Sequence, residues 1–215
     1  MDDAAIKAAQ AEVEALRRRV ARLDGDGLDL LFRQARSHNA WTDAPVTDAE
    51  LEALYDLARM GPTANNGGPA RFVFVRTDAA KEKLAGCVSP GNGPKVRAAP
   101  VTAIVAYDPR YFEHFGRLFP HKPEYQDALA ADPARAETAA FRNSSLQGAY
   151  LIVAARALGL DTGPMSGFDN AAVDAAFLAE DGFKSNFLCA LGHADVGGLF
   201  QRLPRLDFAD ACKLI

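Results

Sequence analysis

The sequence predicts an α+β domain built around one long buried helix. Three short segments rich in β-branched and aromatic residues predict strands at residues 71–76, 100–107 and 185–192. Helical segments separate these strands without the regular alternation that a doubly wound parallel sheet requires. In a fourth segment, 143–160, apolar and small residues cover most of a helix's circumference, which is typical of a buried helix.

This long helix is expected to begin near Ala136 and to end at Gly159, because glycine commonly terminates a helix. At 1.5 Å per residue it would span about 33 Å, the width of a small domain. Arg142 and Gln147 make it too polar for a membrane span. Its small residues allow another backbone to approach closely. Two interpretations therefore stay open, namely a helix buried within one domain and a core helix that also lines a subunit interface.

The composition excludes several classes of protein. With 215 residues, 49% of them hydrophobic, the chain suits one domain with a substantial core. The formal net charge of −4 argues against nucleic-acid binding. Three scattered cysteines predict neither a disulfide framework nor a zinc site. The N-terminus is acidic and has no apolar segment of a signal peptide, so we expect a cytoplasmic protein without a metal or a membrane anchor.

The first 27 residues predict a helical extension to the main domain at 28–215. Apolar residues alternate three and four apart over less than three heptads, at Ile6, Ala9, Val13, Leu16, Val20 and Leu23. The extension can pack on its own domain or pair across a homodimer, and the sequence does not decide between these. The sequence DGDG at 24–27 lacks the spacing of a calcium loop and predicts a turn.

The elements before the second strand follow from local signals. A helix is expected over 28–36, and Thr47 with Glu50 forms a capping box that opens another helix, which ends before Gly61. A turn-rich loop occupies 61–69. A helix over 78–87 and a loop over 89–94 are expected to lead into the central strand at 100–107.

The remaining elements are less regular. Four prolines between residues 108 and 134 predict a surface excursion, which is a lid, a binding loop or a loosely ordered segment. Asp169 is expected to cap a short helix that ends near Ala179. The tail after Gly198 has few signals of its own and is expected to cross onto a neighbouring molecule.

Several common functional motifs are absent. No G-x-G-x-x-G follows a strand, and the one segment with P-loop glycine spacing has Asn92 in place of the lysine. The serine in GPMSG is one position late for a nucleophile elbow. The four histidines lack metal-ligand spacing.

Three polar clusters remain, at residues 36–39, 62–66 and 202–205. Each cluster alone is typical of solvated surface charge or of a turn. Together they supply cations for a phosphate and amides for the edge of a ring system. This combination suits a phosphorylated multi-ring cofactor.

Around these clusters the chain resembles the flavin-dependent nitroreductase family, over residues 28–215. ARSHNAW keeps two residues of the family's first signature, Arg36 and Ser37, while Ala35 and Asn39 replace basic residues. GPTANNGGPARF matches a second signature, although Gly68 replaces a glutamine; the matching residues are Pro62, Thr63, Asn66, Pro69 and Phe72. GLDTGPMSGFD and RLDFADA match two further signatures. The segment 140–169 is similar to the HadB- and RutE-like branch, the malonic semialdehyde reductases.

The resemblance implies a nitroreductase-like α+β fold, with a central, mostly antiparallel sheet flanked by helices. It also implies an intertwined homodimer that binds FMN in two equivalent clefts at the subunit interface, with the long helix as dimer core. Arg36 and Ser37 would contact the phosphate or ribityl chain, with Asn39 nearby. Arg202 and Arg205 would clamp the phosphate.

The resemblance assigns the flavin ring to two other segments. Pro62, Thr63 and Asn66 would approach the ring from the other subunit's loop. The segment Pro164, Met165, Ser166 and Gly167 would lie along the ring, with the Ser166 or Gly167 amide facing N5.

The activity implied is reduction of malonic semialdehyde to 3-hydroxypropionate in pyrimidine degradation. NADH or NADPH would be the reductant in ping-pong turnover, and flavin N5 would carry the hydride, so no catalytic side chain is predicted. The cation for the substrate carboxylate stays open among Arg71, Arg110, Arg117, Lys122 and Arg142. Two alternatives are a broad nitroarene or quinone reductase and a flavin-binding protein without turnover.

Overall fold

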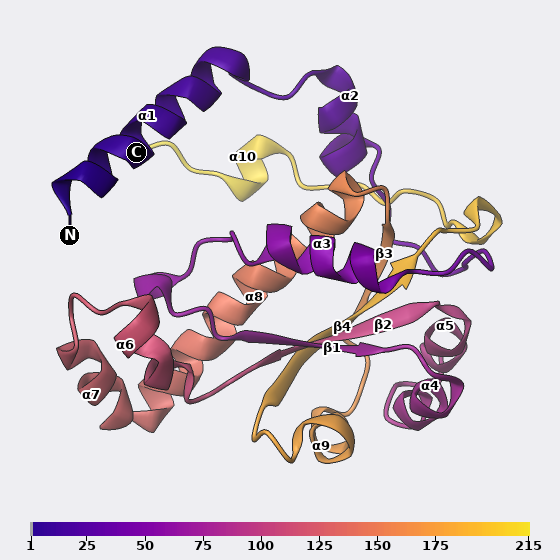
Figure 1. The fold of residues 1–215 in the computed structure, drawn as a ribbon. Coiled ribbons are helices and arrows are strands. Elements are labelled where there is room, and N and C mark those ends of the chain that lie inside the picture. Colours follow the sequence, from indigo (N-terminus) through magenta and orange to yellow (C-terminus); the bar gives the residue numbers. More distant parts are fainter. Residues whose placement is uncertain (1) are drawn as a thin grey trace.

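A four-stranded antiparallel sheet with the strand order β1-β2-β4-β3 forms the centre of the molecule (Figure 1). The computed structural model describes residues 2–215. The strands are β1 (Ala70–Val75), β2 (Val101–Tyr107), β3 (Asp161–Met165) and β4 (Lys184–Gly192). The three predicted strands and the α+β class are confirmed. The edge strand β3 was not predicted.

Helices cover both faces of this sheet (Figure 1). On one face, α3 (Asp48–Ala58) and α8 (Pro133–Ala157) form a core with alternate residues of β2 and β4. On the other face lie α4 (Asp78–Ala85), α5 (Gly93–Ala98) and α9 (Asn170–Val173), which a π-helical turn, Asp174–Leu178, continues. All seven residues of β2 are buried, because both of its faces are covered.

Two of the predicted helix starts are confirmed. The Thr47 hydroxyl accepts from the Glu50 N–H at 3.2 Å, and the Glu50 carboxylate accepts from the Thr47 N–H at 2.7 Å, which completes the capping box. The Asp169 carboxylate accepts from the Ala172 N–H at the start of α9. The turn expected at 24–27 is wrong, because the Asp24 side chain caps a helical turn, α2 (Gly25–Leu28), that runs into a π-helical turn, Asp29–Arg33.

The segment 108–134 is more ordered than a surface excursion. It folds into a 3₁₀ turn (Tyr111–His114), α6 (Phe115–Leu118) and α7 (Glu124–Ala130). Buried side chains from this segment pack against the first turns of α8 in a third core cluster. The loosely ordered alternative is therefore wrong, since aromatic residues of the segment hold it against the domain. A role as a lid or binding loop stays a prediction.

Helix α8 ends as predicted but is buried along one side only. Gly159 follows it with a φ of +79°, the left-handed conformation in which glycine ends helices. The opposite side exposes Phe141 (49%), Leu146 (47%) and Tyr150 (43%). Several exposed large apolar side chains on one helix indicate a candidate interaction surface.

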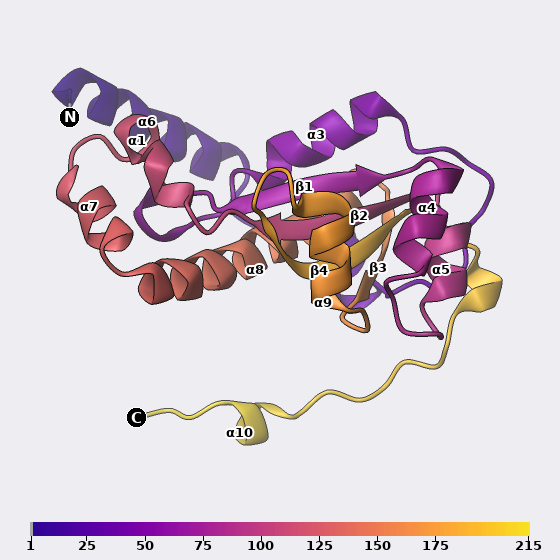
Figure 2. The same cartoon turned by 90° about the horizontal axis from the view of Figure 1, so that it is seen from below.

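Figure 1 shows α1 apart from the sheet and its covering helices, and Figure 2 shows the C-terminal tail extending away from the domain. Helix α1 (Asp3–Arg19) buries none of its residues, and the tail carries a single helical turn, α10 (Phe208–Ala211). Two short 3₁₀ turns, Ala64–Asn66 and Val196–Gly198, complete the elements. Within residues 2–215, no helix is both long and apolar enough to span a bilayer.

Candidate cofactor site

A cavity of about 600 Å³ brings together two of the predicted clusters from opposite ends of the chain. Five predicted residues line it, namely Arg36, Ser37, Asn39, Arg202 and Arg205. Residues 35–39 follow the π-helical turn, and residues 200–205 belong to the tail. We refer to this as the arginine cavity.

The three predicted arginines of this cavity carry charges that no carboxylate neutralises. The guanidinium of Arg36 donates to the Phe200 carbonyl, that of Arg202 to the Ala35 carbonyl at 3.0 Å, and that of Arg205 to the Leu203 carbonyl at 3.0 Å. None of them forms an ion pair within residues 2–215. Backbone carbonyls position these side chains but leave their positive charge available for an anion.

A fourth arginine, Arg156, lines the same cavity from α8 and was not predicted as a site residue. Its Nη1 donates to the Leu31 carbonyl at 3.0 Å, while its buried Nε has no partner among the described residues. Burial lowers the pKa of this guanidinium below its usual range. An arginine within the otherwise apolar last turns of this helix, residues 151–157, was the signal that could have identified it.

Strand β3 connects residues 164–167, the segment predicted to lie along the flavin ring, to the arginine cavity. The His38 N–H donates to the Thr162 carbonyl at 2.9 Å, so residues 36–39 run beside β3. From there Pro164, Met165, Ser166 and Gly167 continue along the sheet edge. Met165 is buried in the core, while Pro164 and Ser166 are exposed.

Two hydrogen bonds hold the end of this segment at Gly167. The Gly167 carbonyl accepts from the Ser89 N–H and from the Asn92 side chain, both at 2.9 Å. The backbone of residues 166–167 is thus held in place at the end of β3.

The remaining predicted cluster lies on a separate cavity of about 860 Å³, which Thr63 and Asn66 line. Pro62 is exposed beside it. The Asn66 side chain donates to the Leu118 carbonyl at 3.0 Å, and Asn66 itself has a φ of +50°. Within one copy of the chain, this loop cavity and the arginine cavity share no lining residue. One copy alone therefore does not unite all the predicted site residues.

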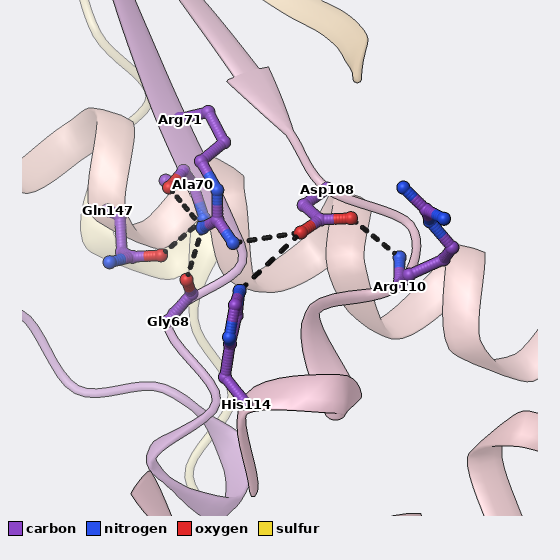
Figure 3. A network of polar contacts seen from close by, with 7 residues as sticks. All are labelled: Gly68, Ala70, Arg71, Asp108, Arg110, His114 and Gln147. Carbon is purple, nitrogen blue, oxygen red and sulfur yellow. Dashed lines mark hydrogen bonds and ion pairs between the residues drawn. The ribbon is translucent and has the colours of Figure 1, made fainter. Parts of the chain in front are cut away.

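A polar network around Arg71 includes several residues that line the loop cavity (Figure 3). The Arg71 guanidinium pairs with the Asp108 carboxylate at 2.9 Å and donates to the carbonyls of Gly68 and Ala70. His114 Nε2 lies 4.0 Å from the same carboxylate. The charge of Arg71 is therefore neutralised. Arg117 lines this cavity and forms no ion pair within residues 2–215.

Residues 32–193 match the model of the Nitroreductase family, which covers most of the chain. The chain belongs to the nitroreductase family. The resemblance seen in the sequence signatures is thereby confirmed. The family match begins after α1 and α2 and ends before the tail.

Curated nitroreductase relatives are similar over nearly their whole length. A protein from Ralstonia pickettii, HadB, is 56% identical over 189 residues, which is 87% of this chain and 96% of the relative. A protein from Burkholderia lata is 56% identical over 192 residues, 89% of this chain and 98% of the relative. Both carry the provisional name NADH dehydrogenase/NAD(P)H nitroreductase.

Solved structures of nitroreductases share the fold. One from Exiguobacterium sibiricum, described in complex with FMN, has a TM-score of 0.74 at 19% identity and covers 90% of this chain and 99% of its own. An NAD(P)H:FMN oxidoreductase, provisionally so named, from Staphylococcus epidermidis has a TM-score of 0.76 at 19% identity, with 90% of this chain and 98% of its own covered. At these identities the comparison establishes the architecture alone.

Proposed function

We propose that this nitroreductase is an FMN-dependent NAD(P)H oxidoreductase whose substrate is malonic semialdehyde. The observation that carries the proposal is the arginine cavity, where Arg36, Arg202 and Arg205 present three unpaired positive charges. A phosphate group would satisfy this donor set, because it accepts several charge-assisted hydrogen bonds at once. The name of the Exiguobacterium structure, which includes FMN, supports the same cofactor.

The chain's own residues would orient the cofactor. Arg36, Arg202 and Arg205 would hold the phosphate, and Ser37 and Asn39 would contact the adjacent ribityl hydroxyls. The Ser166 or Gly167 amide would face the ring, since Gly167 is anchored through its carbonyl. The chemistry that bound FMN supplies is hydride transfer between a nicotinamide and a second substrate.

A second copy of the chain would complete this site. Asn66 lies on the loop cavity and would have to reach the cofactor of the other copy. The exposed apolar side of α8 and the apolar residues of the tail provide a surface for such a dimer; those of the tail are Phe200, Leu203, Leu206 and Phe208. The dimer would also cover the tail, which is fully exposed in one copy.

The charges of the loop cavity favour a carboxylate-bearing acceptor. Of the five candidate cations, Arg71 and Arg117 line the cavity, and Arg71 is already paired with Asp108. Arg117 would therefore bind the carboxylate of malonic semialdehyde. Reduction of the aldehyde consumes one NAD(P)H and one proton and yields 3-hydroxypropionate, with the hydride on carbon and the proton on oxygen.

Broad reduction of nitroarenes or quinones is the alternative, and the names of the relatives favour it. The two functions share the cofactor and differ in the role of Arg117. Steady-state rates on malonic semialdehyde, nitrofurazone and menadione, with NADH and NADPH compared, separate them. Malonic semialdehyde reductase activity predicts the highest kcat/KM on the aldehyde.

Substitution at Arg117 tests the substrate assignment directly. Arg117→Gln should raise KM for malonic semialdehyde about tenfold or more, because a charged hydrogen bond is worth roughly 1.5–3 kcal/mol, and should leave menadione reduction unchanged. Arg142→Gln, which removes a cation outside both cavities, is the matched control. Equal losses on both acceptors would contradict the carboxylate role. A bound flavin that neither nicotinamide reduces under anaerobic conditions would contradict reductase activity altogether.

A further inference from the structure

Helix α1 exposes an apolar stripe that nothing in the described chain covers. Ile6, Val13 and Leu16 on this stripe are 39%, 49% and 50% exposed, and no residue of the helix is buried. Figures 1 and 2 show α1 beside the domain rather than packed along any of its helices. The family match begins at residue 32, so α1 lies outside the part shared with the family model.

A partner would stabilise a helix in this position. Isolated helices shorter than about 12–15 residues are marginal in water, and most helical stability in proteins comes from packing an apolar side. The 17 residues of α1 have favourable ends, with Asp2 as N-cap and arginines in the last turn. These ends define the helix but leave its apolar stripe without a partner.

The charges on α1 identify a second α1 as a suitable partner. The first fourteen residues carry four acidic side chains and one lysine, whereas residues 15–22 carry four arginines and no acid. Two parallel copies would bring like charges together at both ends. Two antiparallel copies would place the acidic half of each helix beside the basic half of the other. Their antiparallel helix dipoles would also attract each other.

The residues that flank the stripe agree with the antiparallel arrangement. Glu12 and Arg19 lie seven residues apart and so flank the same side of the stripe. When Val13 lies opposite Leu16 of a second copy, Glu12 comes beside Arg19 of that copy, and the symmetry repeats the pair. Heptad patterns use flanking pairs of this kind to set orientation.

We propose that α1 forms an antiparallel two-helix pair with α1 of a second copy of this chain. The pair is a contact additional to the surface on α8 and does not involve either cavity. It predicts apolar contact along Val13 and Leu16 and two symmetric Glu12–Arg19 ion pairs. Loss of the pair should leave flavin binding unchanged, so this proposal and the proposed function can fail separately.

Cross-linking through one introduced cysteine at a time, in the whole 215-residue chain, tests both the partner and its direction. Leu16→Cys and Ile6→Cys are each made in a Cys212→Ser background, because Cys212 is exposed. In the proposed register the two residues 16 are offset by about 4.5 Å along the helix axis and the two residues 6 by about 25 Å, at 1.5 Å per residue. A short bis-maleimide should therefore link two chains through position 16 and not through position 6.

Every outcome of this cross-linking decides the proposal. Linking at position 16 alone supports it. Linking at both positions indicates parallel helices and overturns it, as does linking at position 6 alone. If neither position links, α1 packs on its own domain or on another surface such as a membrane, which also overturns it. The Cys212→Ser protein without a new cysteine gives the background from Cys87 and Cys189.

Charge reversal tests the Glu12–Arg19 pair. Arg19→Glu should reduce cross-linking through position 16 several-fold, and Glu12→Arg combined with Arg19→Glu should restore it. Arg18→Glu changes the charge equally on the far side of the helix, where Arg18 is 71% exposed and 3.7 Å from Glu14. This control should cross-link as the parent does, and an equal loss in both reversals would overturn the pairing.

Discussion

The backbone N–H of His38 donates to the carbonyl of Thr162 over 2.9 Å. This bond joins the polar cluster after the first helical turns to an edge strand that begins more than 120 residues later. It places Arg36 and Ser37 beside the segment that starts at Pro164. The phosphate and ring ends of the proposed FMN site therefore depend on one strand-like contact.

Gly163 allows this close approach. A Cβ atom at this position would lie 2.5 Å from the His38 carbonyl oxygen, which is backbone and cannot move aside easily. Gly163→Ala should thus separate residues 36–39 from β3 and weaken FMN binding on the order of tenfold or more, since small displacements of binding groups are costly. Fluorescence titration with FMN measures the effect. Gly116→Ala, where nothing lies within 4 Å, is the control and should bind FMN as the parent does.

Neutralising the unpaired arginines should weaken FMN binding selectively. Arg202→Gln and Arg205→Gln each remove a charged donor worth roughly 1.5–3 kcal/mol, so FMN affinity should fall about 10- to 100-fold. Arg33 lines the same cavity, but its guanidinium already pairs with Asp29 at 2.6 Å. Arg33→Gln is therefore the matched control. An equal loss for Arg33→Gln would show that the cavity responds to general charge rather than to the unpaired arginines.

The Glu137–Lys184 pair should give the stability a defined pH dependence. Lys184 Nζ lies 2.6 Å from the Glu137 carboxylate, and this contact lowers the pKa of the carboxyl below its usual value of 4.5. Its contribution is therefore full above about pH 4.5 and is lost as the pH falls through the lowered pKa. Both side chains are nearly half exposed, so solvent screening keeps the contribution below about 1 kcal/mol.

Urea unfolding of Glu137→Gln at several pH values measures this contribution. The stability difference from the parent should be constant near neutral pH and should shrink below about pH 4.5. Glu180→Gln removes an exposed acid without an ion pair among the described residues and should show no such trend. A difference for Glu137→Gln that persists unchanged at low pH would argue against the pair.

Packing of α8 on the sheet should make Gly148 intolerant of a side chain. A Cβ there would lie 2.5 Å from the Phe187 ring and 3.1 Å from Val105. Alanine would improve helix propensity by about 1 kcal/mol, but overpacking costs about 1–3 kcal/mol. Because Val105 is buried and Phe187 packs against the same core, we expect the clash to dominate and Gly148→Ala to lower the free energy of unfolding. Gly116→Ala has free space and should be neutral or stabilising.

Local sequence signals correctly predicted those elements whose residue types are common in the structure that they form. β2 is a run of apolar residues and lies buried at the centre of the sheet. The strand β3 was missed because Gly163 and Pro164 are turn residues, yet an edge strand tolerates a proline. Helix α5 was missed for a related reason, since Pro94 stands in its first turn, where its lack of an N–H costs nothing.

The grouping of Arg36 with Arg202 and Arg205 was predicted only through the family resemblance and not from local patterns. Signature motifs identified Arg36 and Arg205, whereas only the folded chain shows them on one cavity. Local patterns contain no information on a contact between segments that far apart. Arg156 was missed because both interpretations of its helix, a core helix and a core helix at a subunit interface, gave this arginine no part in the cofactor site.

The most direct test of the central claim is titration of the purified protein with FMN and with riboflavin, which lacks the phosphate. If the arginine cavity binds the phosphate, the protein should take up one FMN per chain, and riboflavin should bind at least about 100-fold more weakly, because several charged hydrogen bonds are lost. A protein that binds neither flavin, or that binds both equally well, would contradict the account.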